Sequence, residues 1–501
     1  MGIEILFVYP DFTVTEVALR PGRYQVEEGG WYAEGLAAMA ASLQHAGHRV
    51  ALLHLTRPPS REEFLEALGR YDPALVGLTV RSSALPYCAQ YTAWVKEVLR
   101  VPAVWGGYHP TLAPEECMAF PGVDGVCLGE GDEAVVELTD ALAGGRDPSR
   151  VRSMWFHTPA GIVRNPVRPL VEDLDLLPLP DFGIFEHSRL QATRARAATA
   201  MVSRGCPFRC GYCSNHRQRA VYPNAHRYPR FRSPAGAIAY LRKLLTWSPG
   251  TREIRFLDNV FGLRQDWLEE FCDLYRREIG LPFACNQRPD LLDRNRASLL
   301  AAAGCRTVYM GIESGDPQIR RVVLGRPVSD ERMVQAFRSC REVGMSTVAY
   351  NMIGLPGEDR SSVLATARLN ARARPSAVVV SVFSPYPGTD LYEISVREGY
   401  VHPPLDYRAR TFLDQPGLPR QDVLLLHLFF RPLVRLYRLF GPDSAPGRMV
   451  ERALLWRRLP ARALVRGADL IRHLLGRLRY ALQNRLPGVY RLLRTLKHSA
   501  A

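Results

Sequence analysis

The chain has 501 residues, 47% of them hydrophobic and 23% charged, and a formal net charge of +15. This length exceeds what one hydrophobic core supports and predicts roughly two to four domains. The N-terminal stretch MGIEILFVYP lacks a basic segment ahead of an apolar one, and no run of about 18 uncharged apolar residues occurs, which argues against a signal peptide and a membrane-spanning helix. Ten cysteines in so long a chain do not indicate a disulfide scaffold, so we expect a cytoplasmic protein.

Residues 1–150 alternate between strand-like and helix-like patterns, which predicts a doubly wound, Rossmann-like parallel sheet. The expected strands are residues 3–9, 50–55, 75–80, 101–105 and 123–128, and the expected helices are residues 32–46, 62–68, 89–99 and 133–143. Ligands bind such sheets at the carboxyl ends of the strands. Glycines follow two of those ends, at Gly106-Gly107 and at Gly129-Glu130-Gly131, and they let a ligand approach the backbone. Ordinary turn glycines are the alternative.

Residues 151–195 are rich in proline and aspartate and predict an extended linker. A second α/β unit follows at residues 196–395, with expected strands at residues 198–203, 253–257, 282–286, 307–312, 346–353 and 377–383 and helical patterns between them. Six strand–helix repeats predict an open or closed barrel whose site lies at the carboxyl ends of the strands.

Residues 396–501 are strongly basic and are expected to be helical from about Asp422. Residues 418–501 contain 17 Lys/Arg against 4 Asp/Glu, so the rest of the chain is close to neutral. An apolar stripe runs from Leu470 to Leu482, and four arginines lie off it: Arg472, Arg477, Arg479 and Arg485. Such helices can lie on an anionic membrane surface, here the inner face of the cell membrane, or pack against the barrel. Nucleic acid is the weakest alternative because few aromatic residues are available for base stacking.

Three of the ten cysteines are clustered directly after a strand, in the loop Cys206-Pro-Phe-Arg-Cys210-Gly-Tyr-Cys213. Unrelated buried thiols rarely fall at such offsets, whereas the seven scattered cysteines are expected to be small buried hydrophobic residues. With His216 the three thiols can close a tetrahedral Cys₃His zinc site. A cubane iron–sulfur cluster on three thiolates instead leaves one iron open to a small-molecule ligand.

The cysteine loop, with the aromatic Tyr212 before its third cysteine, resembles the signature of radical S-adenosylmethionine (SAM) enzymes. Five further segments resemble strand ends of that family in the same order: FLDNVF (residues 256–261), CNQRPD (285–290), GIESG (311–315), NMIGLPGE (351–358) and SPYPGT (384–389). The resemblance implies a (β/α)6 partial TIM barrel with a [4Fe–4S] cluster on Cys206, Cys210 and Cys213. It also implies a protein partner that supplies single electrons.

The same resemblance implies four SAM-binding side chains. Tyr212 lies in the cysteine loop, Asp258 would approach the methionine amino group, Glu313 the ribose or methionine end, and Ile353 the adenine. His216 then has no metal to bind. No further catalytic side chain is assigned.

The N-terminal domain resembles that of the cobalamin-binding radical SAM subfamily, through WGGYHPTLAPEE (residues 105–116) and DGVCLGEGDEAVVEL (residues 124–138). This resemblance implies a B12-binding domain over residues 1–150, with cobalamin near six residues: Gly106, Gly107, His109, Gly129, Glu130 and Gly131. No Asp-x-His-x-x-Gly occurs in the domain, which implies a cobalt without histidine ligation or a domain that has lost the cofactor.

Membership of this subfamily implies methyl transfer to an unactivated carbon of a small substrate, a hydrophobic one if the basic helices deliver it at a membrane. In such enzymes the cofactors perform the difficult steps and the protein positions them. Ring formation or rearrangement without methylation uses the same parts and remains an alternative. A non-catalytic Cys₃His zinc protein is the alternative from another class.

Overall fold

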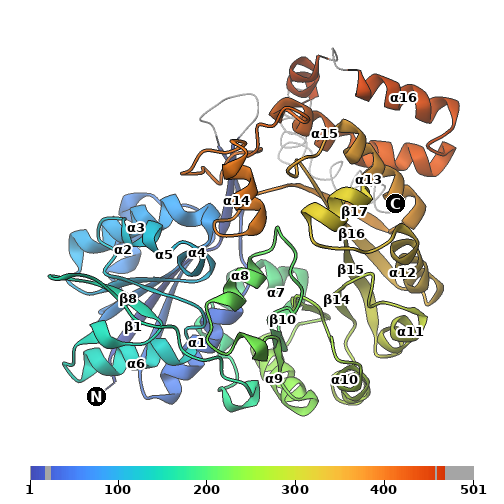
Figure 1. The fold of residues 1–501 in the computed structure, drawn as a ribbon. Helices are drawn as coiled ribbons and strands as arrows, with labels where there is room; N and C mark the ends of the chain where they lie inside the picture. The colour runs from blue at the N-terminus through green and yellow to red at the C-terminus, as the bar shows by residue number, and fades with distance from the viewer. Residues whose placement is uncertain (1, 17–23, 457–459, 469–501) are drawn as a thin grey trace, which may run out of the picture.

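The computed structural model describes residues 2–16, 24–456 and 460–468. The first domain is a seven-stranded sheet in the order β4-β1-β5-β6-β7-β8-β9, and its first five strands are parallel. Its parallel strands are β1 (Glu4–Pro10), β4 (Arg49–Leu55), β5 (Leu75–Thr79), β6 (Ala103–Gly106) and β7 (Gly125–Cys127). Its helices are α1 (Glu34–His45), α2 (Arg61–Leu68), α3 (Leu85–Val98), α4 (Tyr108–Leu112), α5 (Pro114–Met118) and α6 (Asp132–Ala143). The expected doubly wound parallel sheet is therefore confirmed (Figure 1).

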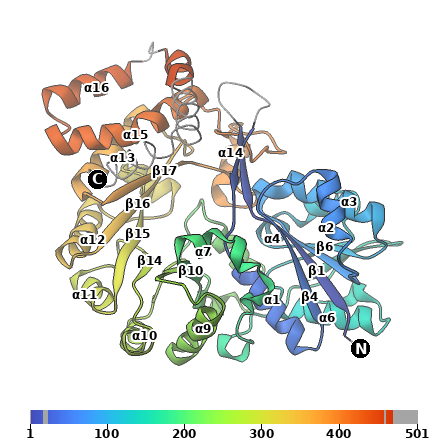
Figure 2. The same cartoon turned by 180° about the vertical axis from the view of Figure 1, so that it is seen from behind.

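Two hairpins in this half of the chain were not expected. β2 (Phe12–Glu16) and β3 (Tyr24–Glu28) form an antiparallel pair that rises above the end of β1 (Figure 2). β8 (Met154–Thr158) and β9 (Gly161–Arg164) add two antiparallel strands to the main sheet through β7. The extended linker expected at residues 151–195 is therefore wrong over this hairpin, because Met154 and Phe156 alternate into the core as strand residues do.

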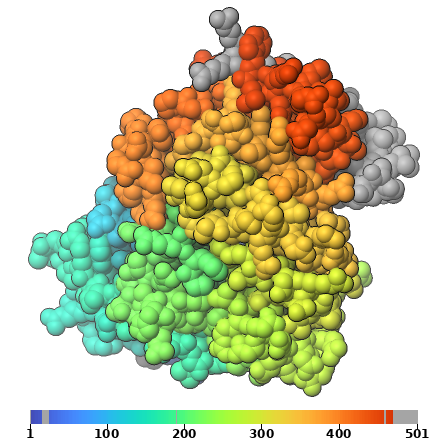
Figure 3. Space-filling view, turned by 45° about the vertical axis from the view of Figure 1, so that its right-hand side comes forward, coloured from blue at the N-terminus to red at the C-terminus, as the bar shows by residue number. Residues whose placement is uncertain are grey.

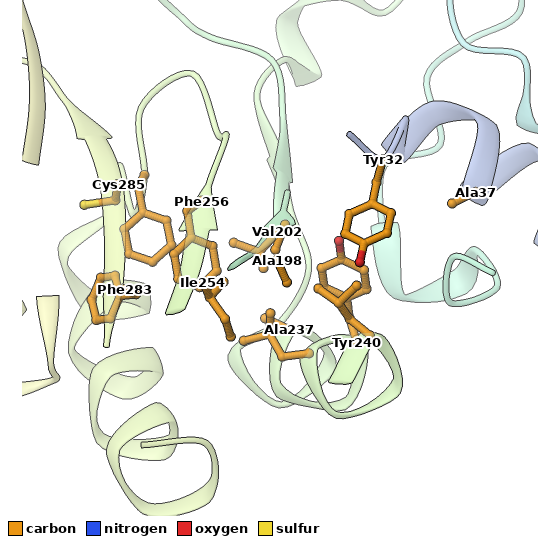
Figure 4. Packing of buried hydrophobic residues seen from close by; sticks show 14 of the residues in the cluster. Tyr32, Ala37, Ala198, Val202, Ala237, Tyr240, Ile254, Phe256, Phe283 and Cys285 are labelled. Atoms are coloured by element: carbon orange, nitrogen blue, oxygen red, sulfur yellow. The ribbon is translucent and has the colours of Figure 1, made fainter. Parts of the chain in front are cut away.

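The rest of that segment is packed and runs between the two domains. It contains the short helix α7 (Gln191–Ala195) and three 3₁₀ turns. Phe182, in one of these turns, is fully buried with ring contacts to Tyr32 at 5.4 Å and to Tyr240 at 6.1 Å. A single hydrophobic cluster therefore includes residues from both domains, and Tyr32 and Tyr240 lie side by side in Figure 4.

The second domain is an open six-stranded sheet whose strands are all parallel and follow chain order. The strands are β10 (Ala197–Ala200), β13 (Glu253–Phe256), β14 (Phe283–Gln287), β15 (Cys305–Glu313), β16 (Ser346–Ile353) and β17 (Ala377–Val382). The outer helices are α9 (Pro234–Trp247), α10 (Gln265–Glu278), α11 (Arg294–Ala302), α12 (Asp330–Glu342) and α13 (Arg360–Ala373). This is the expected (β/α)6 partial barrel, and Figure 1 shows it beside the first domain.

The C-terminal helices lie against the last strand–helix unit of the half-barrel (Figure 3). They follow α14 (Asp390–Arg397) and are α15 (Arg420–Phe440) and α16 (Ala445–Leu455). α15 packs its apolar face on α13 and β17, so the packing alternative holds for this helix. The stripe expected at residues 470–482 lies outside the described residues. Among the helices that are described, none combines the length and the apolar character needed to cross a membrane.

Candidate active site

The cysteine loop lies between β11 (Ser203–Arg204) and α8 (Ser214–Ala220). Cys210 is buried, Cys206 and Cys213 are half-buried, and all three thiols are free. The backbone of Gly211 holds the loop, because its N–H donates to the Leu324 carbonyl at 3.0 Å and its carbonyl accepts from the Leu391 N–H at 3.0 Å. A side chain at position 211 would crowd the Val323 carbonyl, at 3.0 Å from the added carbon.

Two donors point at the thiols. Arg288 Nη1 lies 3.7 Å from the Cys210 sulfur, and Asn215 Nδ2 lies 3.3 Å from the Cys213 sulfur. Burial raises the pKa of the Cys206 and Cys213 thiols, so thiolates need compensating positive charge here. Three thiols with such donors fit an iron–sulfur cluster, in which each thiolate binds a different iron.

The zinc alternative finds less support. His216 is buried and its Nε2 lies 3.3 Å from Asp390 Oδ1, so it has an acidic neighbour outside the cysteine loop. Within the described part of the chain, no three His, Cys, Asp or Glu side chains converge as ligands of one metal ion. This holds for the three thiols alone as well as for the Cys₃His set, so it does not separate a zinc site from a cluster.

A cavity of about 320 Å³ opens beside the loop, within the half-barrel. Its lining is almost entirely polar: Tyr212, Arg255, Asn259, Asn286, Gln287, Arg288, Tyr309, Gly311, Glu313, Arg326 and Tyr350. These residues come from the cysteine loop, from four adjacent strands and from the segments that follow them. The site therefore lies toward the carboxyl ends of the strands, as the sequence predicts.

Glu313 ends β15 in an unusual conformation. Its φ of 66° falls in the left-handed region, which costs free energy for a residue with a side chain. Tyr212 Oη donates to Glu313 Oε1 at 3.1 Å, and Arg326 Nη1 lies 3.7 Å from the same oxygen. Burial raises the pKa of this carboxyl, while Arg326 opposes the rise. A side chain at Gly311 would collide with the Glu313 carboxylate. The strained backbone thus turns Glu313 into the cavity beside the cysteine loop.

Asp258 and Ile353 do not line this cavity. Both Asp258 oxygens accept from the backbone N–H of Val202, at 3.1 and 3.4 Å, and one of them also accepts from Ser203 N–H at 2.7 Å. Burial raises the pKa of Asp258 to about 6. The structure places Asn259, the next residue, in the cavity instead.

Ile353 is fully buried on the opposite face of β16. Side chains alternate along a strand, and Tyr350 already occupies the cavity face, so a residue three positions later points the other way. Ile353 instead belongs to the hydrophobic cluster that includes Val423 of α15. Tyr212 and Glu313 thus lie together at the cavity, whereas Asp258 and Ile353 lie outside its lining, and their contacts with SAM stay a prediction.

The first domain presents the end of β6 to the cysteine loop. α4, which begins at Tyr108, packs against α8, the helix that follows Cys213. A side-chain carbon added at Gly106 would meet a single atom within 4 Å, a carbon of Cys127 at 3.7 Å, so the backbone is open there to a large ligand. Gly107 has a φ of 104° that favours glycine. Gly106 therefore fits a cofactor that approaches the backbone, whereas Gly107 lies against Val80 and Thr79 and makes the turn after β6.

His109 is fully buried, and each of its ring nitrogens has a polar neighbour. Its Nδ1 lies 3.0 Å from Ser82 Oγ, and its Nε2 lies 3.3 Å from Glu116 Oε2. These contacts hold the ring inside the first domain. His109 thus lies behind the loop that follows β6, its Nε2 has no hydrogen-bond partner among the described residues, and its contact with cobalamin stays a prediction.

The expected cobalamin residues Gly129, Glu130 and Gly131 form a contact between the domains. Tyr222 Oη accepts from Glu130 N–H at 2.8 Å and covers Gly129. The Glu130 carboxylate pairs with Arg230 and, at 2.8 Å, with Arg204. Gly129 and Glu130 therefore contact the barrel domain, whereas Gly131 packs against Met39 within the first domain. A role of the three residues in binding cobalamin stays a prediction.

Of the eight polar cavity residues that sequence reasoning did not assign, five are arginines or tyrosines: Arg255, Arg288, Tyr309, Arg326 and Tyr350. Three of them lie inside strands, at Arg255 of β13, Tyr309 of β15 and Tyr350 of β16. Polar side chains within otherwise apolar barrel strands were the available signal, because inward positions of such strands are usually filled by apolar residues.

Residues 201–369 match the radical SAM superfamily, and residues 27–139 match the B12 binding domain. The chain therefore contains a radical SAM domain and a B12-binding domain. As a radical SAM enzyme with this domain, it uses a [4Fe–4S] cluster, SAM and cobalamin as cofactors.

Curated relatives resemble this chain over about three quarters of its length. An uncharacterized methyltransferase of Pyrococcus horikoshii is 27% identical over 385 residues, which cover 76% of this chain and 82% of the relative. The anaerobic magnesium-protoporphyrin IX monomethyl ester cyclase of Rubrivivax gelatinosus is 25% identical over 408 residues, which cover 78% of this chain and 70% of the cyclase.

Solved structures share the fold. The radical SAM methyltransferase TsrM of Kitasatospora setae, with cobalamin and a [4Fe–4S] cluster bound, superposes with a TM-score of 0.64 at 20% identity, covering 80% of this chain and 76% of TsrM. The cobalamin-dependent SAM radical enzyme OxsB superposes with a TM-score of 0.67 at 14% identity, covering 99% of this chain and 75% of OxsB. The two-domain arrangement of this chain thus recurs in cobalamin-containing radical SAM enzymes.

Proposed function

We propose that this radical SAM enzyme is a cobalamin-dependent methyltransferase that acts on an unactivated carbon of a small molecule. One observation carries the proposal: the open backbone after β6 in the B12-binding domain lies against the helix that follows the cysteine loop, through the contact of α4 with α8. The cobalamin domain and the SAM cavity thus adjoin, which methyl transfer onto a radical formed at the SAM site requires.

The proposed cofactor ligands follow from the site. Cys206, Cys210 and Cys213 hold the cluster, Tyr212 and Glu313 bind SAM at the cavity, and Gly106 and Gly107 admit cobalamin. When bound, the cluster and SAM supply a 5′-deoxyadenosyl radical and cobalamin supplies the methyl group.

The chain's own residues support these groups. Arg288 and Asn215 donate toward the thiols, and Tyr212 and Arg326 hold the Glu313 carboxylate in place. Second-layer contacts of this kind set the orientation and charge of the groups that touch a cofactor.

Ring formation without methyl transfer is the competing function, since one group of relatives is named as cyclases. The products of SAM distinguish the two. Methyl transfer by this route consumes two SAM molecules, of which one yields S-adenosylhomocysteine and the other yields 5′-deoxyadenosine and methionine. Cyclisation requires the second cleavage alone.

The anaerobically purified enzyme, reconstituted with iron, sulfide and cobalamin, then reduced and given SAM, should form S-adenosylhomocysteine in amounts that match the bound cobalamin. Chromatography with mass detection measures both nucleoside products. Cys210→Ala, which removes one proposed cluster ligand, should abolish 5′-deoxyadenosine formation. Formation of 5′-deoxyadenosine without any S-adenosylhomocysteine would favour the cyclase. One zinc and no sulfide per chain in the protein as purified, before reconstitution, would instead restore the zinc alternative.

A protein that supplies single electrons is the proposed partner, because cleavage of SAM to the radical requires one-electron reduction. We also propose contact with an anionic membrane surface. Leu439 and Phe440 at the end of α15 are 77% and 57% exposed, and Met449 on α16 is 67% exposed. The same helices carry exposed arginines at Arg431, Arg435, Arg448 and Arg452. Exposed apolar and basic side chains on one pair of helices suit an anionic lipid surface.

A further inference from the structure

Three side chains form the inner part of the SAM cavity: Arg255 on β13, Tyr309 on β15 and Tyr350 on β16. Tyr309 precedes Glu313 by four residues on the same strand. At the rise of a β-strand this places Tyr309 about 13 Å further from the strand's carboxyl end than Glu313. Arg255 lies level with Thr307 through β14, whereas Tyr350 pairs with Gly311 and lies close to the level of Glu313. Arg255 and Tyr309 therefore lie deeper in the half-barrel than Glu313, and Tyr350 lies beside it.

The two tyrosines fix the position of the guanidinium. Arg255 Nη2 donates to Tyr350 Oη at 3.1 Å, and the Arg255 guanidinium carbon lies 4.3 Å from the centre of the Tyr309 ring. The Tyr309 and Tyr350 rings stack at 5.7 Å with an angle of 20° between their planes. A guanidinium that lies on a ring and bonds to a neighbouring hydroxyl loses little further freedom when it binds a ligand.

Arg255 differs from the other two arginines of the cavity. Arg288 forms a two-point ion pair with Asp290 at 3.0 and 2.9 Å, and Arg326 lies 3.7 Å from the Glu313 carboxylate. Among the described residues, Arg255 has no carboxylate partner, and its buried Nε has no hydrogen-bond acceptor. A partly buried cation without an anion is unfavourable, which leaves the cavity with an unmet requirement for negative charge.

We propose that Arg255, held by Tyr309 and Tyr350, binds an anionic group of the substrate, a carboxylate or a phosphate. The fork of N–H donors on arginine matches both groups in a two-point geometry. The anionic group would lie in the part of this polar cavity that Arg255, Tyr309 and Tyr350 line, apart from the Tyr212 and Glu313 lining assigned to SAM. This inference rests on the proposed function, since it names the substrate class of that site. The polar lining favours a substrate with a charged group over a wholly hydrophobic substrate.

The test uses the reconstituted enzyme saturated with SAM and titrated with inorganic phosphate and with benzoate, as phosphate and carboxylate probes. Calorimetry or thermal shift should detect saturable binding of at least one probe, and comparison of the two shows which anion the site prefers. Arg255→Met should weaken that binding by at least about tenfold, the loss typical of a charge-assisted hydrogen bond. Arg264→Met is the matched control, because Arg264 is exposed and paired with Asp266.

Arg255→Lys is a second variant that keeps the test valid if Arg255→Met fails to fold. Lysine keeps the charge but loses the two-point fork, so binding should fall between that of the wild type and Arg255→Met. Iron and sulfide content, measured for every variant, reports whether the fold and the cluster are intact.

Three outcomes would overturn the inference: no binding by the wild type, equal binding by wild type and Arg255→Met, or binding of the probes only when SAM is omitted, which would assign Arg255 to the SAM carboxylate. None of these bears on S-adenosylhomocysteine formation. The proposed methyl transfer can therefore survive the failure of this inference, and the anion site can survive the failure of methyl transfer.

Discussion

Glu34, the first residue of α1, places a carboxyl group in the interior between the two domains. Tyr240 on α9 donates to its Oε2 at 2.7 Å, and its Oε1 is buried without a partner. Burial raises the pKa of Glu34 to about 8. The folded protein therefore keeps this carboxyl protonated at neutral pH, whereas the unfolded chain ionises it near its ordinary value of about 4.3.

Because the folded state holds a proton that the unfolded state releases, the stability contributed by Glu34 is complete at low pH and declines as the pH rises toward 8. The decline is about 1.4 kcal/mol per pH unit between pH 5 and about 8. Glu34→Gln keeps the bond to Tyr240 and cannot ionise, so its urea midpoint should rise relative to wild type as the pH increases from 5.5 to 8.5. Glu66→Gln, at an exposed position of α2, is the control. The same dependence of the urea midpoint on pH in wild type and Glu34→Gln would contradict a raised pKa of Glu34 in the folded protein.

At the scale of elements, a buried ion pair joins the C-terminal helices to the barrel. Arg360, the first residue of α13, binds both oxygens of Asp422 on α15 at 2.9 and 2.8 Å. The same guanidinium donates to the carbonyls of Leu454 and Trp456, at 2.7 and 2.8 Å. One side chain therefore connects α13 to α15 and to the end of α16.

Arg360→Met should destabilise this junction by about 3 to 5 kcal/mol, because Asp422 is left buried without its partner. Limited proteolysis should then cut within residues 441–456 before the rest of the chain. The double variant Arg360→Met, Asp422→Leu should recover much of the loss, since neither charge remains. Arg372→Met, on the same helix at an exposed ion pair, should change the urea midpoint little. Equal protease resistance in all four proteins would show that the ion pair does not hold the helices.

At the scale of the whole molecule, the positive charge is concentrated in the C-terminal segment, which bears on the proposed contact with a membrane. Residues 418–501 carry 17 Lys/Arg against 4 Asp/Glu, which accounts for nearly all of the net +15. The first part of this segment, α15, is attached to the barrel through a large apolar cluster. Removing it would expose that cluster, so deletion of the basic segment cannot separate membrane contact from folding.

Charge reversal on the surface avoids this difficulty. The intact enzyme should sediment with phosphatidylglycerol vesicles at low salt and less at high salt, since each arginine near the surface contributes about 1 kcal/mol that salt screens. Arg448→Glu with Arg452→Glu on α16 should weaken the binding. Arg276→Glu with Arg277→Glu on α10 makes the same change of charge at an exposed site elsewhere and should not. Equal binding to anionic and neutral vesicles would exclude the electrostatic contact.

The sequence by itself determined the order of the units. Strand and helix periodicity, the three clustered cysteines and the basic C-terminal segment are local patterns, and each predicts its structure without distant contacts. The doubly wound sheet, the partial barrel and the position of the cysteine loop followed from them. The hairpins β2–β3 and β8–β9 did not, because they are antiparallel pairs outside the strand–helix alternation and β8–β9 lies in a segment that proline and aspartate made resemble a linker.

Tertiary structure alone decided which side chains meet in the cavity. Arg255, Tyr309 and Tyr350 are separated by up to 95 positions in the sequence, and only the pairing of β13 through β16 brings them together. The same packing turned Asp258 toward the backbone of Val202 and Ser203 and left Asn259 in the cavity. A motif identifies the residue types of a site, but the face that each residue presents depends on the register and curvature of strands that are distant in the chain.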